Sequence, residues 1–454
     1  MTAPTSIAPL HALRAAVRGD VAGPDDQGYA LALPWNRAVG VRPRAVVAAS
    51  GPDDVAAAIR VAGEHGLRVV PQRTGHGAVA VGDDVLLVHT GRLDEVAIDP
   101  DARLARVGAG ATWQQVLDAA APHGLTAIAG SAPHVGVAGY LTGGGIGPLV
   151  RSHGLSSDHV RSMTVATGDG ELRRAAADEH PDLLWGLRGG KAALGVVVEL
   201  ELELHPIAVL HGGALFFAGE DAAAVLHAWR AWAAGLPDHA TTSVALLQLP
   251  AIPGVPEPLA GRPTVAVRFA STADDETCAA LVAPIRAAAP VLLDALGPLP
   301  SAALGAIHAD PVEPMPVHDG GALLTGLPEA AVDALLTHAG PGSGSPQTIV
   351  ELRQLGGALV DGPDCAFDHR VAPFALLRAG IAAPPLGGEV RRHGAALEQA
   401  LAPWIGPGLP PNFAAGDDPD RATRCWTPAT RRRLHELAAR YDPAGTLAAG
   451  ATGR

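Results

Sequence analysis

Residues 67–78 read LRVVPQRTGHGA, a short apolar strand followed by a loop in which two glycines flank one histidine. A strand-like run at 45–48 and an amphipathic pattern at 53–65 precede it, so residues 44–70 predict one βαβ unit. Because glycine has no Cβ, its backbone can approach a ligand closely. The first candidates for ligand contacts are the loop residues Arg73, Thr74, Gly75, His76, Gly77 and Ala78.

A denser glycine run, AGSAPHVGVAGYLTGGGIG, follows at 129–147. Glycine disfavours helices and strands, so this run predicts irregular backbone that lies close to a diphosphate and a planar ring. Residues 108–113, GAGATW, open a helix that we expect to run through Ala121. This segment does not fit a nicotinamide-binding Rossmann motif, because the third glycine is absent and no acidic residue ends a following strand at the required distance.

The rest of the chain predicts further β-structure. Short β-runs over 85–107 indicate an antiparallel meander. Beyond His205-Pro206, strand-like runs at 213–217, 243–249 and 265–270 alternate with alanine-rich helices. The pattern predicts a second domain in which helices cover an antiparallel sheet.

We therefore expect an α+β protein with three sequence segments. The first domain comprises 1–207, the second domain 208–404, and residues 405–454 return to the first domain. The return includes a helix over 431–440 that ends before a proline.

Length and composition narrow the function classes. The 454 residues suffice for two cores, and a 48% hydrophobic content predicts a folded chain. A formal charge of -13 and the lack of a long Lys/Arg block argue against nucleic acid as a partner. No apolar run reaches the roughly 18 residues of a membrane span or resembles a signal peptide, so we expect a cytoplasmic protein that does not bind membranes. The oligomeric state is not indicated.

Metal, hydrolase and phosphotransferase signatures are also missing from the sequence. Cys278, Cys365 and Cys425 lie far apart without a CxxC pair, and the 19 histidines form neither an HExxH motif nor a close triplet with Asp or Glu. A GxSxG elbow and a Walker-type loop are absent. We therefore expect no metal ion.

In their order along the chain, the motifs resemble the flavin domain of the berberine-bridge-type branch of the vanillyl-alcohol-oxidase superfamily. The resemblance covers 44–207 and 405–454, whereas the middle third matches mainly through LGGA at 355–358. It implies a two-domain PCMH-type FAD-binding fold with a second, substrate-binding domain. The matching motifs are TGHG at 74–77, GAGATW at 108–113, residues 133–147, DLLW at 182–185, RGG at 188–190, GVV at 195–197, NF at 412–413 and YDP at 441–443.

The resemblance implies that FAD lies between the two domains and is attached covalently. The diphosphate is expected near residues 73–78 and the ring near residues 131–147. His76 matches the residue that bonds to the flavin 8α-methyl group, which anchors the cofactor and makes it a stronger oxidant. The further cofactor contacts expected are Ser131, His134, Val135, Gly136, Gly139, Tyr140, Gly143, Gly144, Ile146, Val196, Val197 and Asn412.

The chain departs from the family pattern at three places. Ala132 stands where some members have a second flavin-linked cysteine, so we expect a single covalent bond. Pro410 stands where a tyrosine is common, so the usual phenolic base is missing. Residues 191–194, KAAL, replace a more glycine-rich loop, which predicts a stiffer backbone beside the cofactor.

Flavin oxidation of a substrate needs a base for the accompanying proton. The run 348–355 alternates and places Glu351 and Arg353 on one strand face. If this face looks at the flavin, Glu351 is a candidate base and Arg353 orients the substrate or lowers the pKa of Glu351; the alternative is a solvent-exposed ion pair. His369 is a second candidate, with a structural role as its alternative. Further candidates to act at the ring or line it are Tyr140, Asn36 and His134.

The sequence therefore predicts an FAD-dependent oxidase with molecular oxygen as acceptor. Its expected substrate is a small hydroxylated, amine or polyketide-like metabolite from secondary metabolism. One alternative is a dehydrogenase with another acceptor or a redox-neutral cyclase, and another is a catalytically silent flavin-binding protein.

Overall fold

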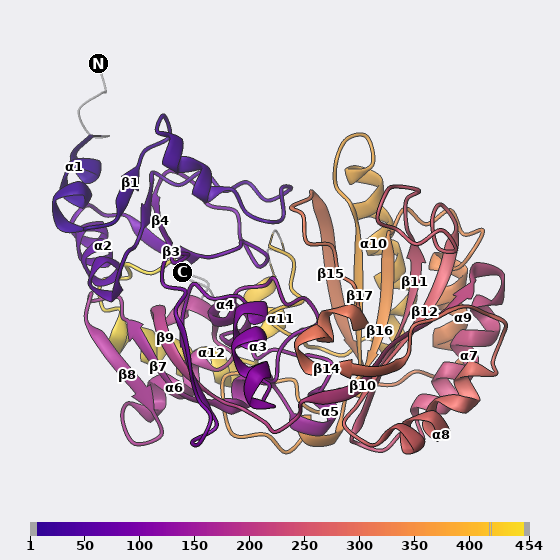
Figure 1. Ribbon diagram of the computed structural model, residues 1–454. Helices are drawn as coiled ribbons and strands as arrows, with labels where there is room; N and C mark the ends of the chain where they lie inside the picture. Colours follow the sequence, from indigo (N-terminus) through magenta and orange to yellow (C-terminus); the bar gives the residue numbers. More distant parts are fainter. Residues whose placement is uncertain (1–6, 417, 419, 449–454) are drawn as a thin grey trace.

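The computed structural model describes residues 7–416, 418 and 420–448, and the strands of this part of the chain form three sheets. Figure 1 shows two sheets in the half of the molecule coloured indigo to magenta and the third in the half coloured mainly orange. The fold is therefore built from two sheet-based halves, which agrees with the α+β prediction.

The first sheet is mixed, with the spatial order β1 (Asp20–Ala22), β2 (Ala45–Ala48), β4 (Val85–His89) and β3 (Arg68–Gln72). Strands β2, β4 and β3 are parallel, and β1 pairs antiparallel with β2. Helices α1 (Ile7–Ala16) and α2 (Pro52–Glu64) pack against each other beside it. Pro52 in the first turn of α2, with Asp53 and Asp54, favours helix initiation there.

The second sheet is antiparallel, with the spatial order β5 (Val96–Asp99), β6 (Leu104–Gly108), β9 (Val196–Glu203), β7 (Val160–Ala166) and β8 (Leu172–Ala176). Helix α3 (Trp113–Ala120) begins with a capping box between Thr112 and Gln115. The other helices of this half are α4 (Val137–Leu141), α5 (Val150–His153) and α6 (Pro181–Leu187).

Two local predictions for the first half are wrong. The meander expected over 85–107 begins only at β5, because all five residues of β4 are buried and the strand joins the parallel sheet instead. The glycine run contains α4, since Val137 and Leu141 lie one turn apart and both enter the core.

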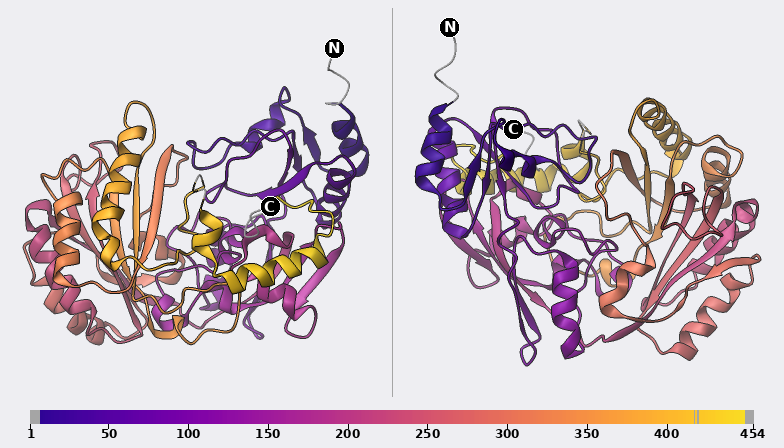
Figure 2. Two further views of the ribbon diagram at one scale, coloured as in Figure 1. Left: turned by 180° about the vertical axis from the view of Figure 1, so that it is seen from behind. Right: turned by 45° about the horizontal axis from the view of Figure 1, so that its top comes forward.

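The third sheet is antiparallel and has eight strands, in the order β13 (Val291–Asp294), β10 (Val209–Ala218), β12 (Pro263–Ser271), β11 (Ala240–Gln248), β16 (Ile349–Gln354), β17 (Phe374–Ile381) and β15 (Val317–Leu324), with β14 (Gly297–Pro300) also paired to β10. One face is covered by α7 (Ala222–Ala233), α8 (Asp275–Arg286), α9 (Glu329–Ala339) and α10 (Gly387–Leu401), as Figure 2 shows. Trp229, Phe217 and Phe269 fill the interior between sheet and helices. The predicted antiparallel sheet with covering helices is confirmed.

The C-terminal segment lies against the first half of the molecule. Helix α12 (Pro428–Tyr441) begins at Pro428, with the Thr427 side chain capping it, and follows α11 (Arg421–Cys425). Arg433 lies 3.7 Å over the Trp185 ring, and the Tyr441 hydroxyl donates a hydrogen bond to Asp182 at 3.0 Å. The exact domain boundaries stay a prediction.

Short 3-10 helices connect these elements, and none of the described helices is long and apolar enough to cross a membrane. They are η1 (Gln27–Ala32), η2 (Ala121–His123), η3 (Ser156–His159), η4 (Lys191–Ala193), η5 (Gly219–Asp221), η6 (Ser301–Ile307), η7 (Gly357–Leu359) and η8 (Ala402–Trp404).

One buried arginine joins the two halves. Arg151 on α5 donates hydrogen bonds to the backbone carbonyls of Leu236 at 3.0 Å, Ala240 at 2.9 Å and Leu355 at 2.8 Å. It also forms an ion pair with Asp238 at 3.1 Å. Arg151, on a helix of the first half, is therefore the hydrogen-bond donor for three carbonyls of the second half.

Replacing Arg151 with methionine is expected to lower the free energy of unfolding by about 2–4 kcal/mol, because buried carbonyls lose their donors while the volume is largely kept. Urea unfolding followed by circular dichroism measures the change. The matched control is Arg14→Met, which removes an exposed pair with Asp26 and should cost about 0.5 kcal/mol or less. Equal losses in the two variants would contradict the interdomain role of Arg151.

Candidate active site

A cavity of about 820 Å³ opens between the two halves of the molecule. This volume lies in the upper part of the roughly 300–1,000 Å³ range of ligand pockets. Its walls come from β3 and the following loop, the glycine run, the sheet face opposite α7 to α10, and the C-terminal segment. The predicted cofactor contacts that line it are Arg73, Thr74, Gly75, His76, Gly77, Ala78, Ser131, His134, Val135, Gly136, Gly139, Tyr140, Ile146, Val197 and Asn412.

Three predicted cofactor contacts do not line the cavity. Gly143 packs against the side chains of Asn412 and Lys191, and Gly144 faces the Phe367 ring. Val196 is fully buried in the core beneath the first sheet. All three residues are buried, so they pack behind the cavity wall and do not face the cavity.

His76 is held in a fixed orientation at the cavity wall. Its ring stacks on Trp35 with centroids 4.7 Å apart, and its Nδ1 lies 2.7 Å from the Thr74 hydroxyl. The loop is anchored where the Trp35 amide donates to the Thr74 carbonyl at 2.8 Å. Gly75 has φ of +74°, and a Cβ there would lie 2.5 Å from the Pro34 Cα, so this tight turn requires glycine.

The imidazole of His76 is neutral at physiological pH. Burial lowers the pKa of His76 to about 3, the nearby His134 acts in the same direction, and Asp310 opposes them. The ring of His134 lies 4.9 Å away, and burial also lowers the pKa of His134. With Nδ1 paired to Thr74, the Nε2 atom of His76 is buried without a hydrogen-bond partner.

The loop residues fit a flavin nucleotide. Gly77 and Gly139 line the cavity, and a Cβ at either position would meet no atom within 4 Å, so their backbones face open space. A large ligand can therefore approach both backbones closely. The unpartnered, neutral Nε2 of His76 on the same wall suits a bond to carbon, because a buried polar atom otherwise keeps its desolvation cost.

Tyr140 and Asn412 lie on the wall formed by α4 and the C-terminal segment. The Tyr140 hydroxyl is buried without a partner, and burial raises the pKa of Tyr140 above its ordinary value. The Asn412 amide donates to the Tyr140 carbonyl at 2.9 Å, while its oxygen accepts from Lys191. Tyr140 therefore suits packing against a ring better than accepting a proton.

Lys191 belongs to the loop where the chain departs from the family pattern. Its backbone has φ of +58°, and its ammonium group donates to the Gly139 carbonyl at 3.1 Å as well as to Asn412. Burial, with Arg421 nearby, lowers the pKa of Lys191 to about 7. A titrating cation thus stands beside the cavity.

Glu351 is buried on β16, in the sheet that forms the cavity wall of the second half of the molecule. The alternative of a solvent-exposed pair with Arg353 is therefore wrong. The oxygens of Glu351 lie 2.7 Å from Arg268, 2.9 Å from Arg353 and 3.3 Å from His308. The Ser243 hydroxyl donates a further hydrogen bond at 2.7 Å. The predicted Glu351–Arg353 pair exists, and both residues line the cavity.

The proton affinity of Glu351 is too low for an effective general base. Burial alone would raise the pKa of Glu351, but Arg353 and Arg268, together with His308, hold it well below its ordinary value. Catalytic bases work best when their pKa lies near the operating pH. The arrangement therefore favours a role in which Glu351 holds Arg353 at the cavity.

Two other predicted candidates lie away from the cavity. His369 does not line it; its Nε2 lies 3.1 Å from the Cys425 carbonyl, and its ring packs on Gly408. Asn36 accepts from the amides of Ala38 and Val317, both at 3.1 Å, and joins the halves near Trp35. Their hydrogen bonds to backbone make both residues structural.

Sequence reasoning missed Asp310, which lines the cavity after η6. It accepts a hydrogen bond from the Ser131 hydroxyl at 3.1 Å and interacts electrostatically with His76, His134 and Arg353. No motif marks this aspartate. Its only local signal is the strained backbone of Ala309, with φ of +51°, which the sequence does not reveal.

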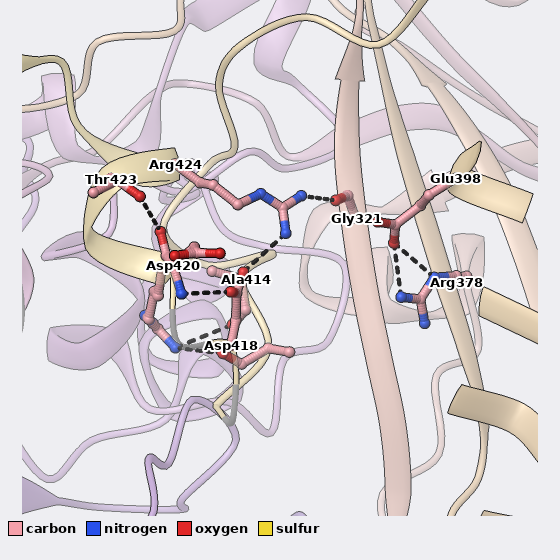
Figure 3. Close-up of polar contacts among 10 residues, drawn as sticks. Gly321, Arg378, Glu398, Ala414, Asp418, Asp420, Thr423 and Arg424 are labelled. Atoms are coloured by element: carbon pink, nitrogen blue, oxygen red, sulfur yellow. Dashed lines mark hydrogen bonds and ion pairs between the residues drawn. The ribbon is translucent and has the colours of Figure 1, made fainter. Parts of the chain in front are cut away.

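The cavity edge formed by the C-terminal segment is fixed by ion pairs, shown in Figure 3. Arg424 pairs with Asp418 at 2.8 Å and donates to the Gly321 carbonyl on β15 at 3.1 Å. On the same sheet, Arg378 pairs with Glu398 of α10 at 2.7 Å. Of these contacts, the hydrogen bond from Arg424 to Gly321 ties the segment that carries Asn412 to the second half.

Comparison with known proteins supports a flavin site. Residues 43–176 match the FAD binding domain family. The chain is 32% identical over 194 residues to (R)-6-hydroxynicotine oxidase of Paenarthrobacter nicotinovorans, a match that covers 42% of each chain.

Solved structures match over the whole length. 6-Hydroxy-D-nicotine oxidase of Arthrobacter nicotinovorans superposes with a TM-score of 0.82 at 22% identity, covering 99% of both chains. BBE-like 1 of Physcomitrella patens superposes with a TM-score of 0.83 at 18% identity, covering 98% of this chain and 99% of the other. The predicted resemblance and fold class are confirmed.

The buried Glu351 network yields a prediction for stability. Glu351→Gln is expected to lower the free energy of unfolding at pH 7 by about 3–5 kcal/mol, because Arg268 and Arg353 lose their counter-charge. The pKa of Glu351 is lowered in the folded state, so its contribution is complete above the ordinary value of 4.5 and is lost as the pH falls through the folded pKa. Urea unfolding between pH 7 and acid conditions should show the gap closing below about pH 4.

The control for this series is Glu329→Gln, which removes an exposed pair with Arg230. It should change stability by about 0.5 kcal/mol or less at every pH. A gap between wild type and Glu351→Gln that stays constant into acid would show that the glutamate is not ionised in the folded protein.

Proposed function

We propose that the chain is an FAD-dependent oxidase, because residues 43–176 match the FAD binding domain family and the fold is that of 6-hydroxy-D-nicotine oxidase and BBE-like 1. Bound FAD would supply the hydride acceptor. The proposed substrate is a small hydroxylated, amine or polyketide-like metabolite, with molecular oxygen as the final acceptor. The observation that carries the proposal is the neutral, oriented His76 at the wall of the large cavity.

His76 is the proposed attachment point of the flavin. Its imidazole is unprotonated, stacked on Trp35 and left with one unpartnered nitrogen, as a nucleophile toward carbon requires. The cofactor would be held by the loop that follows β3 and by Ser131 to Tyr140. Ala132 offers no thiol, so the proposal includes a single covalent link.

The cavity wall on the side of the second half of the molecule is proposed to bind and deprotonate the substrate. Arg353, held by Glu351 and lying 5.6 Å from the centre of the Phe413 ring, presents a fixed cation for a hydroxyl or carbonyl oxygen. Asp310 is the proposed proton acceptor, because only Ser131 donates a described side-chain hydrogen bond to it. Glu351 is assigned a positioning role.

His76→Ala is expected to bind FAD without covalent attachment, since alanine has no nucleophile while the glycine loop stays intact. Acid precipitation followed by absorbance of pellet and supernatant measures the attached fraction. Flavin should stay with the wild-type pellet and appear in the supernatant of the variant. His134→Ala, which alters the neighbouring imidazole, should keep the flavin attached. Release of flavin from wild type, or its retention by His76→Ala, would refute the assignment.

Asp310→Asn is expected to slow flavin reduction by substrate about 10²- to 10⁴-fold, the usual contribution of a general base. Stopped-flow absorbance of the flavin measures this step, and peroxide release reports the acceptor. Flavin content should be unchanged. Glu313→Gln, an exposed carboxylate in the same loop, is the control and should leave the rate unchanged. Substrate turnover without peroxide would instead favour the dehydrogenase or cyclase, and flavin that no metabolite reduces would favour a silent protein.

A further inference from the structure

Three side chains that commonly bind metals meet where the chain leaves the first half of the molecule. His159 ends η3, Glu203 ends β9, and His205 follows it two residues later. The antiparallel pairing of Val160 with Leu202 brings these segments together. One ligand atom from each of the three residues lies within 4.8 Å of the other two.

The hydrogen bonds of His159 fix which nitrogen can bind a metal. Its Nε2 lies 2.8 Å from the His153 carbonyl, which can only accept, so Nε2 carries the proton. The lone pair is therefore on Nδ1, which faces His205 Nε2 at 3.0 Å and Glu203 Oε2 at 3.9 Å. An imidazole that donates its other N–H to a carbonyl is the usual arrangement of a metal-bound histidine.

We propose that His159 Nδ1, His205 Nε2 and Glu203 Oε2 bind one Zn²⁺ ion, with water in the fourth position. Zinc–nitrogen bonds of about 2.0–2.1 Å place two tetrahedral ligand atoms roughly 3.3 Å apart. The two histidine nitrogens lie 3.0 Å apart, and His159 Nδ1 lies 3.9 Å from Glu203 Oε2. Two imidazoles and a carboxylate suit Zn²⁺ better than Ca²⁺ or Mg²⁺, which prefer oxygen ligands.

Metal binding requires a change of tautomer at His205. Without metal, the contact between His205 Nε2 and His159 Nδ1 requires one shared proton, which His205 supplies. On binding, this proton moves from Nε2 to Nδ1 of His205, which makes the Nε2 lone pair available to the metal ion and leaves the charge of the ring unchanged.

The surrounding charges permit a cation here. Arg161 binds Glu203 through the other carboxylate oxygen, Oε1, at 2.5 Å and leaves Oε2 directed at the histidines. The Arg161 side chain is 64% exposed, so water screens its charge. The half-buried imidazole of His153 lies next to the cluster, with its ring centroid 4.9 Å from that of His205.

The position of the site indicates a structural role. His205 directly precedes the crossover to β10, and His153 belongs to α5, whose Arg151 bonds to the second half. A metal ion would join η3 to the end of β9 at this connection. None of the three ligands lines the flavin cavity, so the site is independent of the proposed oxidase chemistry.

The test uses the purified, flavin-loaded protein after removal of metals with a chelator. Zn²⁺ competition with a chromophoric chelator is expected to show one site per chain and a thermal midpoint that rises with Zn²⁺ concentration. Co²⁺ should give the visible bands of a tetrahedral complex at wavelengths where flavin does not absorb. His159→Gln and His205→Gln should lose at least about 100-fold in affinity, more than the 10- to 100-fold cost of losing an outer-shell partner.

The matched control is His227→Gln, which alters an exposed histidine that also pairs with a carboxylate, Asp333 at 3.1 Å. It should keep the wild-type affinity. The proposal is overturned if the wild-type chain binds no Zn²⁺, or if His159→Gln and His205→Gln bind it as wild type does. The wild-type titration decides even if a variant fails to fold, and Glu203→Gln, which keeps the volume of the side chain, provides a further folded variant.

Discussion

The packing of His76 between Trp35, Thr74 and His134 is the constraint on which the rest of the site depends. A nucleophilic imidazole must be unprotonated and must present one nitrogen, and both conditions are met by burial beside a hydroxyl partner. The left-handed backbone of Gly75 allows the loop to pack against Pro34 and hold this geometry. The glycines of the loop thus serve two purposes, close packing on one side and ligand access on the other.

On the opposite wall of the cavity, the buried ionisable group Glu351 is charged, in contrast to His76. His76 loses its charge because Asp310 only partly offsets the desolvation of the imidazole, whereas Glu351 keeps its charge because Arg268 and Arg353 lie within 3 Å. The imidazole of His76 is therefore neutral, as covalent attachment to a carbon atom requires. The opposite wall carries fixed charges that can orient a polar substrate, and the strand alternation that placed Glu351 beside Arg353 was visible in the sequence.

The sequence was most informative where function depends on contiguous residues. The loop at 73–78, the glycine run and the motif order predicted the flavin domain, because backbone approach requires glycine at fixed positions. Asp310 could not be predicted, since it meets Ser131 only through tertiary packing. The same holds for His159 and Glu203, which strand pairing joins across more than forty residues of sequence. His369 was misplaced because its partner, the Cys425 carbonyl, lies on a segment that returns late in the chain.

The departures from the family pattern also restrict which residue can accept the substrate proton. Pro410 is buried and has no side-chain proton acceptor, so the C-terminal segment cannot supply the usual base. In the same region the Lys191 amine donates hydrogen bonds to Asn412 and to the Gly139 carbonyl. The proposed proton acceptor therefore lies on the other wall, where two arginines already balance the negative charge of Glu351. Asp310 lines the cavity from the second half of the molecule, and it accepts a hydrogen bond from Ser131 in the glycine run.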